Sequence, residues 1–282
     1  MIKLIVSDLD GTMLNDDHVT IPPSNIAALA KAQNQGIKIA VATGRTYSIS
    51  GHIIKQLPCN YLIFSNGAAA LDLETGKTIY SAGIPYTDGE KILRRLSKTE
   101  CVYSVVCANN VYMEKHHLDE FQKVINNGAF MEFLLPKMNL VSNIFDAINE
   151  REIEKIEAFN LEDREKQHFK EYVLSLAPWN FSSSYNGSNI EITAPDATKG
   201  KALVELCRLL DISKNEVMAF GDSDNDIDML SWASHSFAME NAIPSVKAAA
   251  ANGAGRNEAG GVGKAVEDYL EKNLRQRYTA LQ

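Results

Sequence analysis

The sequence has 282 residues, 45% of them hydrophobic and 23% charged, which is enough apolar material for a sizeable buried core. Its net charge of −8 and its lack of a basic cluster argue against nucleic-acid binding and against docking to an anionic membrane. The apolar run at residues 2–6 is too short for a signal or a membrane span, and the four scattered cysteines form no C-x-x-C pair, so we expect a soluble, cytoplasmic protein with reduced thiols.

The first third of the chain alternates buried strands with amphipathic helices. Strand and helix patterns follow one another at residues 2–8, 24–35, 37–43, 45–57 and 61–65. Ser24 is a candidate cap for the first helix, and residues 74–77 favour a β-hairpin. Near-continuous apolar strands separated by helices are typical of βαβ units in a parallel sheet covered on both faces.

A different pattern occupies residues 84–190. Helices are expected at 87–98 and 162–176, and strand-like runs at 101–108, 110–115, 155–161, 179–185 and 189–193. Paired strands with helices between them indicate an α+β unit. After Pro195 the first pattern returns, with helices expected at 199–210, 244–251 and 263–274 and strands at 216–221 and 235–239. The sequence therefore predicts a doubly wound α/β core, residues 1–83 and 191–282, interrupted by an inserted α+β domain, residues 84–190.

Polar sequences stand where four strands of the core end. They are Asp8-x-Asp10-Gly-Thr, Thr43-Gly44-Arg45, Ser65-Asn66-Gly67 and Gly221-Asp222-Ser-Asp-Asn225-Asp226. Because ligands bind beyond the carboxyl ends of strands in open parallel sheets, we expect these ends to line one crevice. Two carboxylates about 4 Å apart repel by roughly 4 kcal/mol at an effective dielectric near 20, so several acids there favour a hard cation such as Mg²⁺. The alternative is that each aspartate only caps the helix that follows it.

An EF-hand calcium loop beginning at Asp222 is excluded. The sixth position of such a loop needs glycine and the twelfth needs glutamate, but Ile227 and Ala233 stand there. His116 and His117 are expected on a solvated face without a metal partner at useful spacing. No P-loop or strand-linked G-x-G-x-x-G occurs either, so nucleotide hydrolysis by a P-loop and dinucleotide binding are unsupported.

Two further features suit a phosphate group. Gly44 allows close approach of the backbone beside the Thr43 hydroxyl, and helix N-terminal amides bind anions. Lys199, at the expected start of a helix, could neutralise charge during phosphoryl transfer. The alternatives are an ordinary turn and a solvated lysine.

The ordered motifs IVSDLDGTML, VATGR, TKGKAL and AFGDSDNDIDML resemble the four motifs of the haloacid dehalogenase superfamily. The insert between the second and third motifs resembles the type IIB cap of the Cof-like phosphatase branch. The resemblance implies a Rossmann-like core with a cap domain and the activity of a phosphoric monoester hydrolase that uses Mg²⁺.

The resemblance also implies roles for single residues. Asp8 is the nucleophile that forms an aspartyl-phosphate, and Asp10 the general acid and base. The Mg²⁺ ion is bound by Asp8, the Asp10 carbonyl and Asp222, with Asp226 further out or acting through water. The phosphoryl group is held by the Leu9 amide, Thr43, Gly44, Lys199 and Asn225.

The expected substrate is a small phosphorylated metabolite, a sugar phosphate first of all, and the expected assembly a monomer or homodimer. Cap residues such as Asn189, Tyr185 or Trp179 are candidates for setting substrate choice. Two other functions stay open: a phosphomutase on the same core, and a non-catalytic sensor of phosphate ligands.

Overall fold

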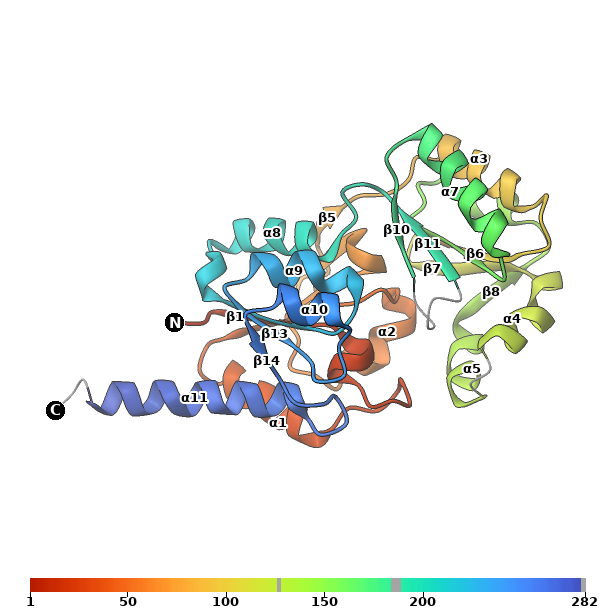
Figure 1. The fold of residues 1–282 in the computed structure, drawn as a ribbon. Coiled ribbons are helices and arrows are strands. Elements are labelled where there is room, and N and C mark those ends of the chain that lie inside the picture. Colours follow the sequence, from red (N-terminus) through yellow and green to blue (C-terminus); the bar gives the residue numbers. More distant parts are fainter. Residues whose placement is uncertain (126–127, 184–188, 280–282) are drawn as a thin grey trace.

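The computed structural model describes residues 1–125, 128–183 and 189–279. It contains two β-sheets, each with its own helices, lying side by side (Figure 1). We call the elements around the larger sheet the core and those around the smaller sheet the cap. The predicted fold class, a doubly wound α/β core with an inserted α+β cap, is confirmed.

The core sheet has eight strands in the order β14-β13-β12-β1-β2-β3-β4-β5. The strands are β1 (Leu4–Ser7), β2 (Lys38–Ala42), β3 (Tyr61–Phe64), β4 (Ala69–Asp72), β5 (Thr78–Ser81), β12 (Val217–Gly221), β13 (His235–Ala238) and β14 (Asn252–Gly253). Neighbours from β14 to β3 pair in parallel, whereas β3, β4 and β5 pair antiparallel, with the predicted hairpin joining β4 to β5. Strand β1 lies between β2 and β12, so the segments that follow these three strands emerge at the same edge.

Helices cover both faces of the core sheet. They are α1 (Pro23–Gln33), α2 (Tyr47–Ile54), α8 (Lys199–Leu210), α9 (Ile227–Trp232), α10 (Pro244–Ala249) and α11 (Gly261–Thr279). Helices α1 and α11 pack together on one side, and α8, α9 and α10 lie on the other (Figure 1). Helix α1 begins with Pro23 and has Pro22 as its cap, so the expected Ser24 cap is wrong. Proline suits this first position because its missing N–H would have no partner there.

The cap sheet has six strands in the order β10-β11-β9-β6-β7-β8. The strands are β6 (Val102–Cys107), β7 (Asn110–Glu114), β8 (Met138–Val141), β9 (Lys155–Phe159), β10 (Asn180–Ser182) and β11 (Asn189–Thr193). Side chains alternate between the two faces, as they must along a strand. Apolar residues such as Ile156 and Ile192 join one apolar cluster, while Lys155 and Glu191 lie on the opposite face.

Five helices complete the cap: α3 (Tyr86–Leu96), α4 (Leu118–Ile125), α5 (Gly128–Leu134), α6 (Ile144–Ile148) and α7 (Asp163–Leu176). Helices α3 and α7 cover the face turned away from the core (Figure 1). Helices α4 and α5, which the sequence patterns did not predict, pack on the other face through Phe121, Phe130 and Met131. The polar part of that face is not covered by the described cap helices and faces the core. The division of the chain at residues 84 and 190 stays a prediction.

Candidate active site

Asp8 lies where β1 ends, at the start of a tight turn over Leu9–Met13. Its backbone amide still donates to the carbonyl of Phe220 on β12 at 3.1 Å, so the sheet fixes its position. Gly11 in this turn has a φ of +71°, which glycine adopts without strain. A Cβ on Gly11 would lie 2.4 Å from Oδ2 of Asp222. Only glycine therefore lets this turn approach the loop after β12 so closely.

Three acids from the two motifs meet at this edge of the sheet. One carboxylate oxygen each from Asp8, Asp222 and Asp226 lies within 4.8 Å of the others. Asp8 and Asp226 are buried and Asp222 is partly buried. The sequence thus predicted correctly that acids about 214 positions apart would come together at the strand ends.

Lys199, the first residue of α8, is the buried cation of this cluster. Its Nζ donates to Oδ1 of Asp8 and to Oδ1 of Asp226, both at 2.7 Å, and its side chain is only 1% exposed. Burial opposes the charge of Lys199, but the two carboxylates outweigh it and raise the pKa of the lysine. The sequence left open whether Lys199 is a solvated lysine or a cation within the site. Its burial shows that the first alternative is wrong.

The acids carry more negative charge than one lysine balances. Burial raises the pKa of Asp8 well above its ordinary value, with Lys199 offsetting this only in part. Burial and then the charge of Asp226 raise the pKa of Asp222 to about 6. Carboxylates in this state are stabilised as anions by a cation, and an all-oxygen donor set suits a hard divalent ion. The residues present therefore fit a Mg²⁺ ion.

The hydrogen bonds distinguish the acids from one another. Both oxygens of Asp226 are engaged, Oδ1 with Lys199 and Oδ2 with the amides of Asp222 and Ser223 at 3.0 and 3.1 Å. Asp222 accepts from Thr12 at 2.8 Å and from the Ser223 hydroxyl at 3.1 Å. Asp226 is thus placed to orient Lys199 and the Asp222 loop rather than to ligate an ion directly.

Asp10 has a different partner. Its carboxylate accepts from Nε of Arg45 at 2.8 Å and is also paired with Nη2 of Arg45, and Nδ1 of His18 lies 2.9 Å from Oδ1. Burial opposes ionisation of Asp10, but the Arg45 charge and the His18 hydrogen bond outweigh it and hold its pKa well below the usual range. Arg45 in turn lies over the rings of Phe130 and Phe133 from α5 of the cap, at 5.5 and 6.0 Å from their centroids.

The predicted phosphate-binding residues lie around the same turn. Thr43 is buried at the end of β2, and its Oγ1 accepts from the Arg45 amide at 3.1 Å. A Cβ on Gly44 would lie 2.7 Å from Oδ1 of Asn66, so the backbone comes close at that point. The same Asn66 oxygen accepts from Nδ2 of Asn225 at 3.0 Å. Asn66, which the sequence placed at the crevice without a binding role, thus joins the second and fourth motifs, since its backbone amide also donates to the Thr43 carbonyl at 3.1 Å.

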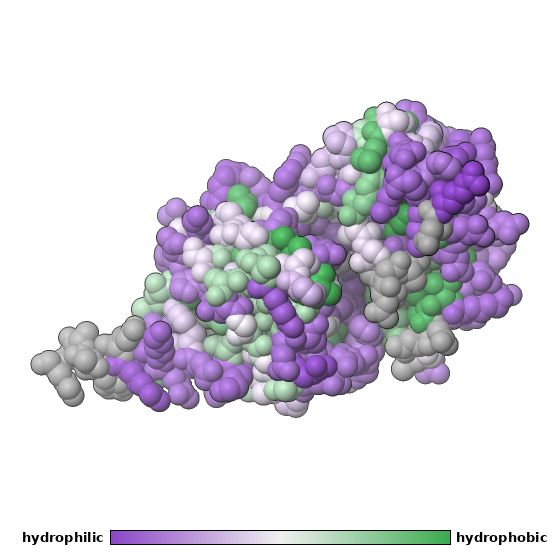
Figure 2. All heavy atoms as spheres, viewed as in Figure 1, coloured by the Kyte–Doolittle hydropathy of each residue, from purple (hydrophilic) through white to green (hydrophobic). Residues whose placement is uncertain are grey.

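Charged side chains on the cap face turned toward the core contact Gly44 and Asn66. Nζ of Lys155 on β9 donates to the Gly44 carbonyl at 3.1 Å and lies 2.8 Å from Glu157 and 3.4 Å from Glu191. Glu191 on β11 accepts from Nδ2 of Asn66 at 2.5 Å. These side chains are almost fully buried, although Figure 2 shows a hollow between core and cap on the face in view. A polar network therefore runs from the cap strands to the motifs predicted to bind phosphate.

This network was not predicted. Assigning the residues of β9 and β11 to the two faces of the sheet would have indicated it. In KIEAF the polar Lys155 and Glu157 are separated by one apolar residue, and in NIEIT every second residue is polar. Glu157 and Glu191 are direct cross-strand neighbours, so Lys155, Glu157 and Glu191 share one face. Among the cap residues expected to set substrate choice, Asn189 is buried beside Glu191, with its Nδ2 at 3.4 Å from Oε1. Trp179 is instead part of the apolar cluster under α3 and α7, and Tyr185 lies outside the described residues.

The sequence matches a known family over residues 5–266, almost its whole length: the haloacid dehalogenase-like hydrolases. The chain belongs to this family. The resemblance drawn from the four motifs is thereby confirmed.

Relatives of similar length support the assignment. The putative phosphatase YxeH of Bacillus subtilis is 27% identical, with 96% of this chain and 99% of that protein covered. The 5-amino-6-(5-phospho-D-ribitylamino)uracil phosphatase YbjI of Escherichia coli is 28% identical, with 96% and 97% covered. A solved structure of the HAD subclass IIB sugar phosphatase BT4131 superposes with a TM-score of 0.79 at 27% identity, with 95% and 98% covered. The expectation of a phosphatase enzyme is confirmed by the family and these relatives.

A membrane-spanning helix was not expected. Within the described ranges, no helix combines the length and the apolar character that a bilayer span requires.

Proposed function

We propose that the protein is a Mg²⁺-dependent phosphatase that hydrolyses small phosphorylated metabolites through an aspartyl-phosphate on Asp8. One observation carries the proposal: Asp8, Asp222 and Asp226 lie within 4.8 Å of one another around the buried Lys199. Such a cluster is costly for stability without a bound cation, because like charges repel in a buried site. It suits transfer of a phosphoryl group.

In the first step an oxygen of Asp8 attacks phosphorus and the bond to the ester oxygen breaks. Asp10 gives its proton to that leaving oxygen, which departs as an alcohol. In the second step Asp10 takes a proton from water, the water oxygen attacks phosphorus, and the bond to Asp8 breaks to release phosphate. Because Arg45 holds Asp10 as a carboxylate, we infer that this pairing must loosen before Asp10 carries a proton.

The remaining residues of the site would bind the Mg²⁺ ion and the phosphoryl group. Mg²⁺ would be held by Asp8, the carbonyl of Asp10 and Asp222, and when bound it offsets negative charge on the attacking carboxylate and the phosphoryl oxygens. Lys199 donates to the phosphoryl group or to Asp8 and is oriented by Asp226. The amides of Leu9 and Gly44, the Thr43 hydroxyl and the Asn225 amide are the proposed hydrogen-bond donors to phosphate.

The cap suggests a leaving group rich in hydroxyls, as in a sugar phosphate. Lys155, Glu157 and Glu191 offer one donor group and two carboxylate acceptors on the face turned to the core. Hydroxyl groups can pair with both kinds of partner, whereas a second phosphate would be repelled by the carboxylates. The name of one relative, a sugar phosphatase, and that of another, which acts on a phosphoribityl compound, agree with this choice.

The test is a phosphate-release screen over phosphorylated metabolites, with and without Mg²⁺, on the native chain and three variants. We expect Mg²⁺-dependent turnover, no turnover for Asp8→Asn, and a loss of at least about 100-fold for Asp10→Asn. Asp196→Asn, at an exposed carboxylate paired with Lys201, is the matched control and should keep full activity. Unchanged turnover in Asp10→Asn would remove the general acid from the proposal.

The same screen separates the other two functions. An isomerised sugar phosphate without free phosphate would indicate a phosphomutase, and uniformly negligible turnover with retained phosphate binding would indicate a sensor. The cytoplasmic location and the monomeric or homodimeric state stay predictions from the sequence.

A further inference from the structure

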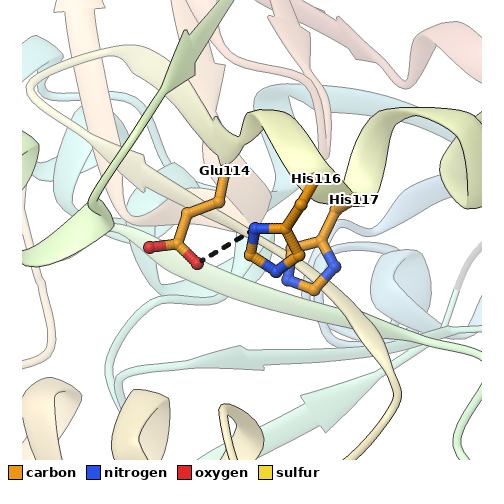
Figure 3. A group of neighbouring side chains, drawn as sticks. All are labelled: Glu114, His116 and His117. Carbon is orange, nitrogen blue, oxygen red and sulfur yellow. Dashed lines mark ion pairs between the residues drawn. The ribbon is translucent and has the colours of Figure 1, made fainter.

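A second group of potential metal ligands lies on the cap, at the end of β7. Glu114 is the last residue of this strand, and a short turn over Lys115–His117 leads from it into α4. Figure 3 shows the ring of His116 directed toward Glu114, with the ring of His117 beside it. One ligand atom from each of Glu114, His116 and His117 lies within 4.8 Å of the others. We propose that these three side chains bind a divalent transition-metal ion of the Zn²⁺ type.

The donor set selects the kind of ion. Imidazole nitrogens suit Zn²⁺, Cu²⁺ and Ni²⁺, whereas Mg²⁺ prefers oxygen ligands. Two histidines and one glutamate are a known zinc-binding combination that leaves a fourth position for water. The site therefore differs in ion preference from the carboxylate cluster around Asp8.

Glu114 is held in place as a ligand. Its Oε1 accepts from the Ile144 amide at 3.0 Å and its Oε2 accepts from the Tyr103 hydroxyl at 3.2 Å. These bonds come from the start of α6 and from β6, so two separate elements fix the carboxylate. Hydrogen bonds of this kind orient a metal ligand and are a usual part of metal sites.

His116 supplies the adjustable ligand. Its Nδ1 lies 3.8 Å from Oε2 of Glu114, and its side chain is 66% exposed. Zinc bonds of about 2.0–2.1 Å in a tetrahedral site place ligand atoms roughly 3.3 Å apart, so a shift of about half an ångström brings Nδ1 of His116 and Oε2 of Glu114 to that separation. An exposed histidine makes that shift without disturbing the packed interior.

His117 supplies an independent observation that points to a ligand. Its Nε2 is buried and has no hydrogen-bond partner among the described residues, although its ring packs edge-on against Tyr103 at 4.6 Å between centroids. A buried polar atom without a partner costs free energy and calls for an explanation. A metal ion bound at this nitrogen would supply the missing partner.

The site is remote from the catalytic edge. Asn109, just before β7, accepts from the amides of Tyr47 and Ser48 in the core, whereas Glu114 stands at the other end of the strand. Five residues of extended strand span about 17 Å. Binding at Glu114 is therefore expected to leave the Asp8 cluster unoccupied by this ion. The expected solvated face is confirmed for His116, which is 66% exposed, but is wrong for His117, which is partly buried. Glu114, only two positions before His116, was not foreseen as their neighbour.

The test uses the full chain, stripped with chelator and returned to buffer with excess Mg²⁺, which occupies sites that prefer oxygen. Titration with Co²⁺ should give the visible absorption of a tetrahedral nitrogen-containing site with one ion per chain, and Zn²⁺ should displace it. His116→Ala and Glu114→Gln should each weaken Co²⁺ binding at least tenfold. His168→Ala, at an exposed histidine on α7, is the matched control and should bind as the native chain does.

Circular dichroism and thermal melting check that the variants fold, and the His116 side chain is 66% exposed, so its removal leaves the packed interior unchanged. Absence of the Co²⁺ spectrum in the native chain would overturn the proposal. So would an unchanged affinity in both folded variants. Phosphatase activity does not enter this readout, so the inference stands or falls separately from the proposed function.

Discussion

Arg45 binds Asp10 through two guanidinium nitrogens, one of them Nε at 2.8 Å from Oδ2, while its Cζ lies over the Phe130 ring of the cap, 5.5 Å from the centroid. A residue of the core therefore contacts both the proposed general acid and the domain that covers it. Guanidinium groups are suited to this double contact because they pair with carboxylates in a planar fork and stack on rings. Arg45 thus links Asp10 to the cap through direct contacts on both sides.

Replacing Arg45 by alanine is expected to lower kcat/KM by about 10- to 100-fold, because Asp10 loses the partner that positions it. Arg45 also lowers the pKa of Asp10, so its removal raises that pKa. An acid with a higher pKa keeps its proton to higher pH, and the alkaline fall of kcat/KM should move upward. Steady-state kinetics over a pH series measures both effects.

Arg45→Lys keeps the charge but not the fork and should fall between the alanine variant and the native enzyme. Arg208→Ala, at an exposed arginine paired with Glu205 on α8, should change neither rate nor profile. A native profile in Arg45→Ala would show that the contact with Asp10 has no part in the reaction.

The core of the site was predictable from sequence because it depends on backbone topology. Parallel strands that end in Asp8, Thr43 and Asp222 must bring those residues to one edge, whatever the side chains do. The pairing of Asp10 with Arg45 was not predictable in the same way, since a long side chain can turn in several directions from its position after Thr43.

The cap was harder to predict from the sequence than the core, because neither the contacts of its polar face nor its helices α4 and α5 were recognised. Its open face follows from the alternation in KIEAF and NIEIT, but the partner of that face becomes visible only when Lys155 reaches the carbonyl of Gly44. Helix α4 is short but has a clear amphipathic pattern, which was overlooked. Helix α5 has only seven residues, too few for periodicity to indicate it, and its packing is completed by the folded cap.

The close approach at Gly11 gives a second prediction. Gly11→Ala should abolish the stabilisation of the fold by Mg²⁺ and reduce turnover at least about 100-fold, because the added Cβ would lie 2.4 Å from Oδ2 of Asp222. Gly76→Ala is a matched control, since Gly76 has nearly the same φ, +70° against +71°, and nothing within 4 Å of the added atom. It should lose about 1 kcal/mol from backbone strain and keep its activity. Thermal melting with and without Mg²⁺, together with phosphate release, measures the difference; equal behaviour of the two variants would contradict it.

Thiol reactivity gives a third prediction. Burial raises the pKa of Cys59 and of Cys207 to about 12, from an ordinary value near 9. A higher pKa leaves less thiolate, so at pH 8 the reactive fraction falls by roughly 1,000-fold. Ellman's reagent should therefore leave both residues unmodified in the folded chain and titrate four thiols in urea, consistent with the four free cysteines found. Rapid labelling of Cys207 in the folded protein, located by mass spectrometry, would contradict the prediction.

The charged network under the cap gives the last prediction. Lys155 is 6% exposed and lies between Glu157 and Glu191; burial opposes its charge, but the carboxylates outweigh it and raise its pKa. Lys155→Met leaves two buried carboxylates without their cation, and breaking a buried ion pair in this way costs about 3–5 kcal/mol in the free energy of unfolding. Urea denaturation measures this loss.

Two control variants test whether the loss of stability in Lys155→Met comes from burial of the charges. Lys3 forms a 2.7 Å pair with Glu216, nearly the distance of the Lys155–Glu157 pair, but its side chain is 55% exposed, so Lys3→Met should cost less than about 1 kcal/mol. Adding Glu157→Gln and Glu191→Gln to Lys155→Met removes the unpaired charges and should restore part of the lost stability, but not turnover of a hydroxyl-rich substrate, because the cap would then lack its ionic partners. If Lys155→Met and Lys3→Met destabilised the chain equally, the network would contribute no more than a surface ion pair, and its proposed role in holding the substrate between cap and core would be contradicted.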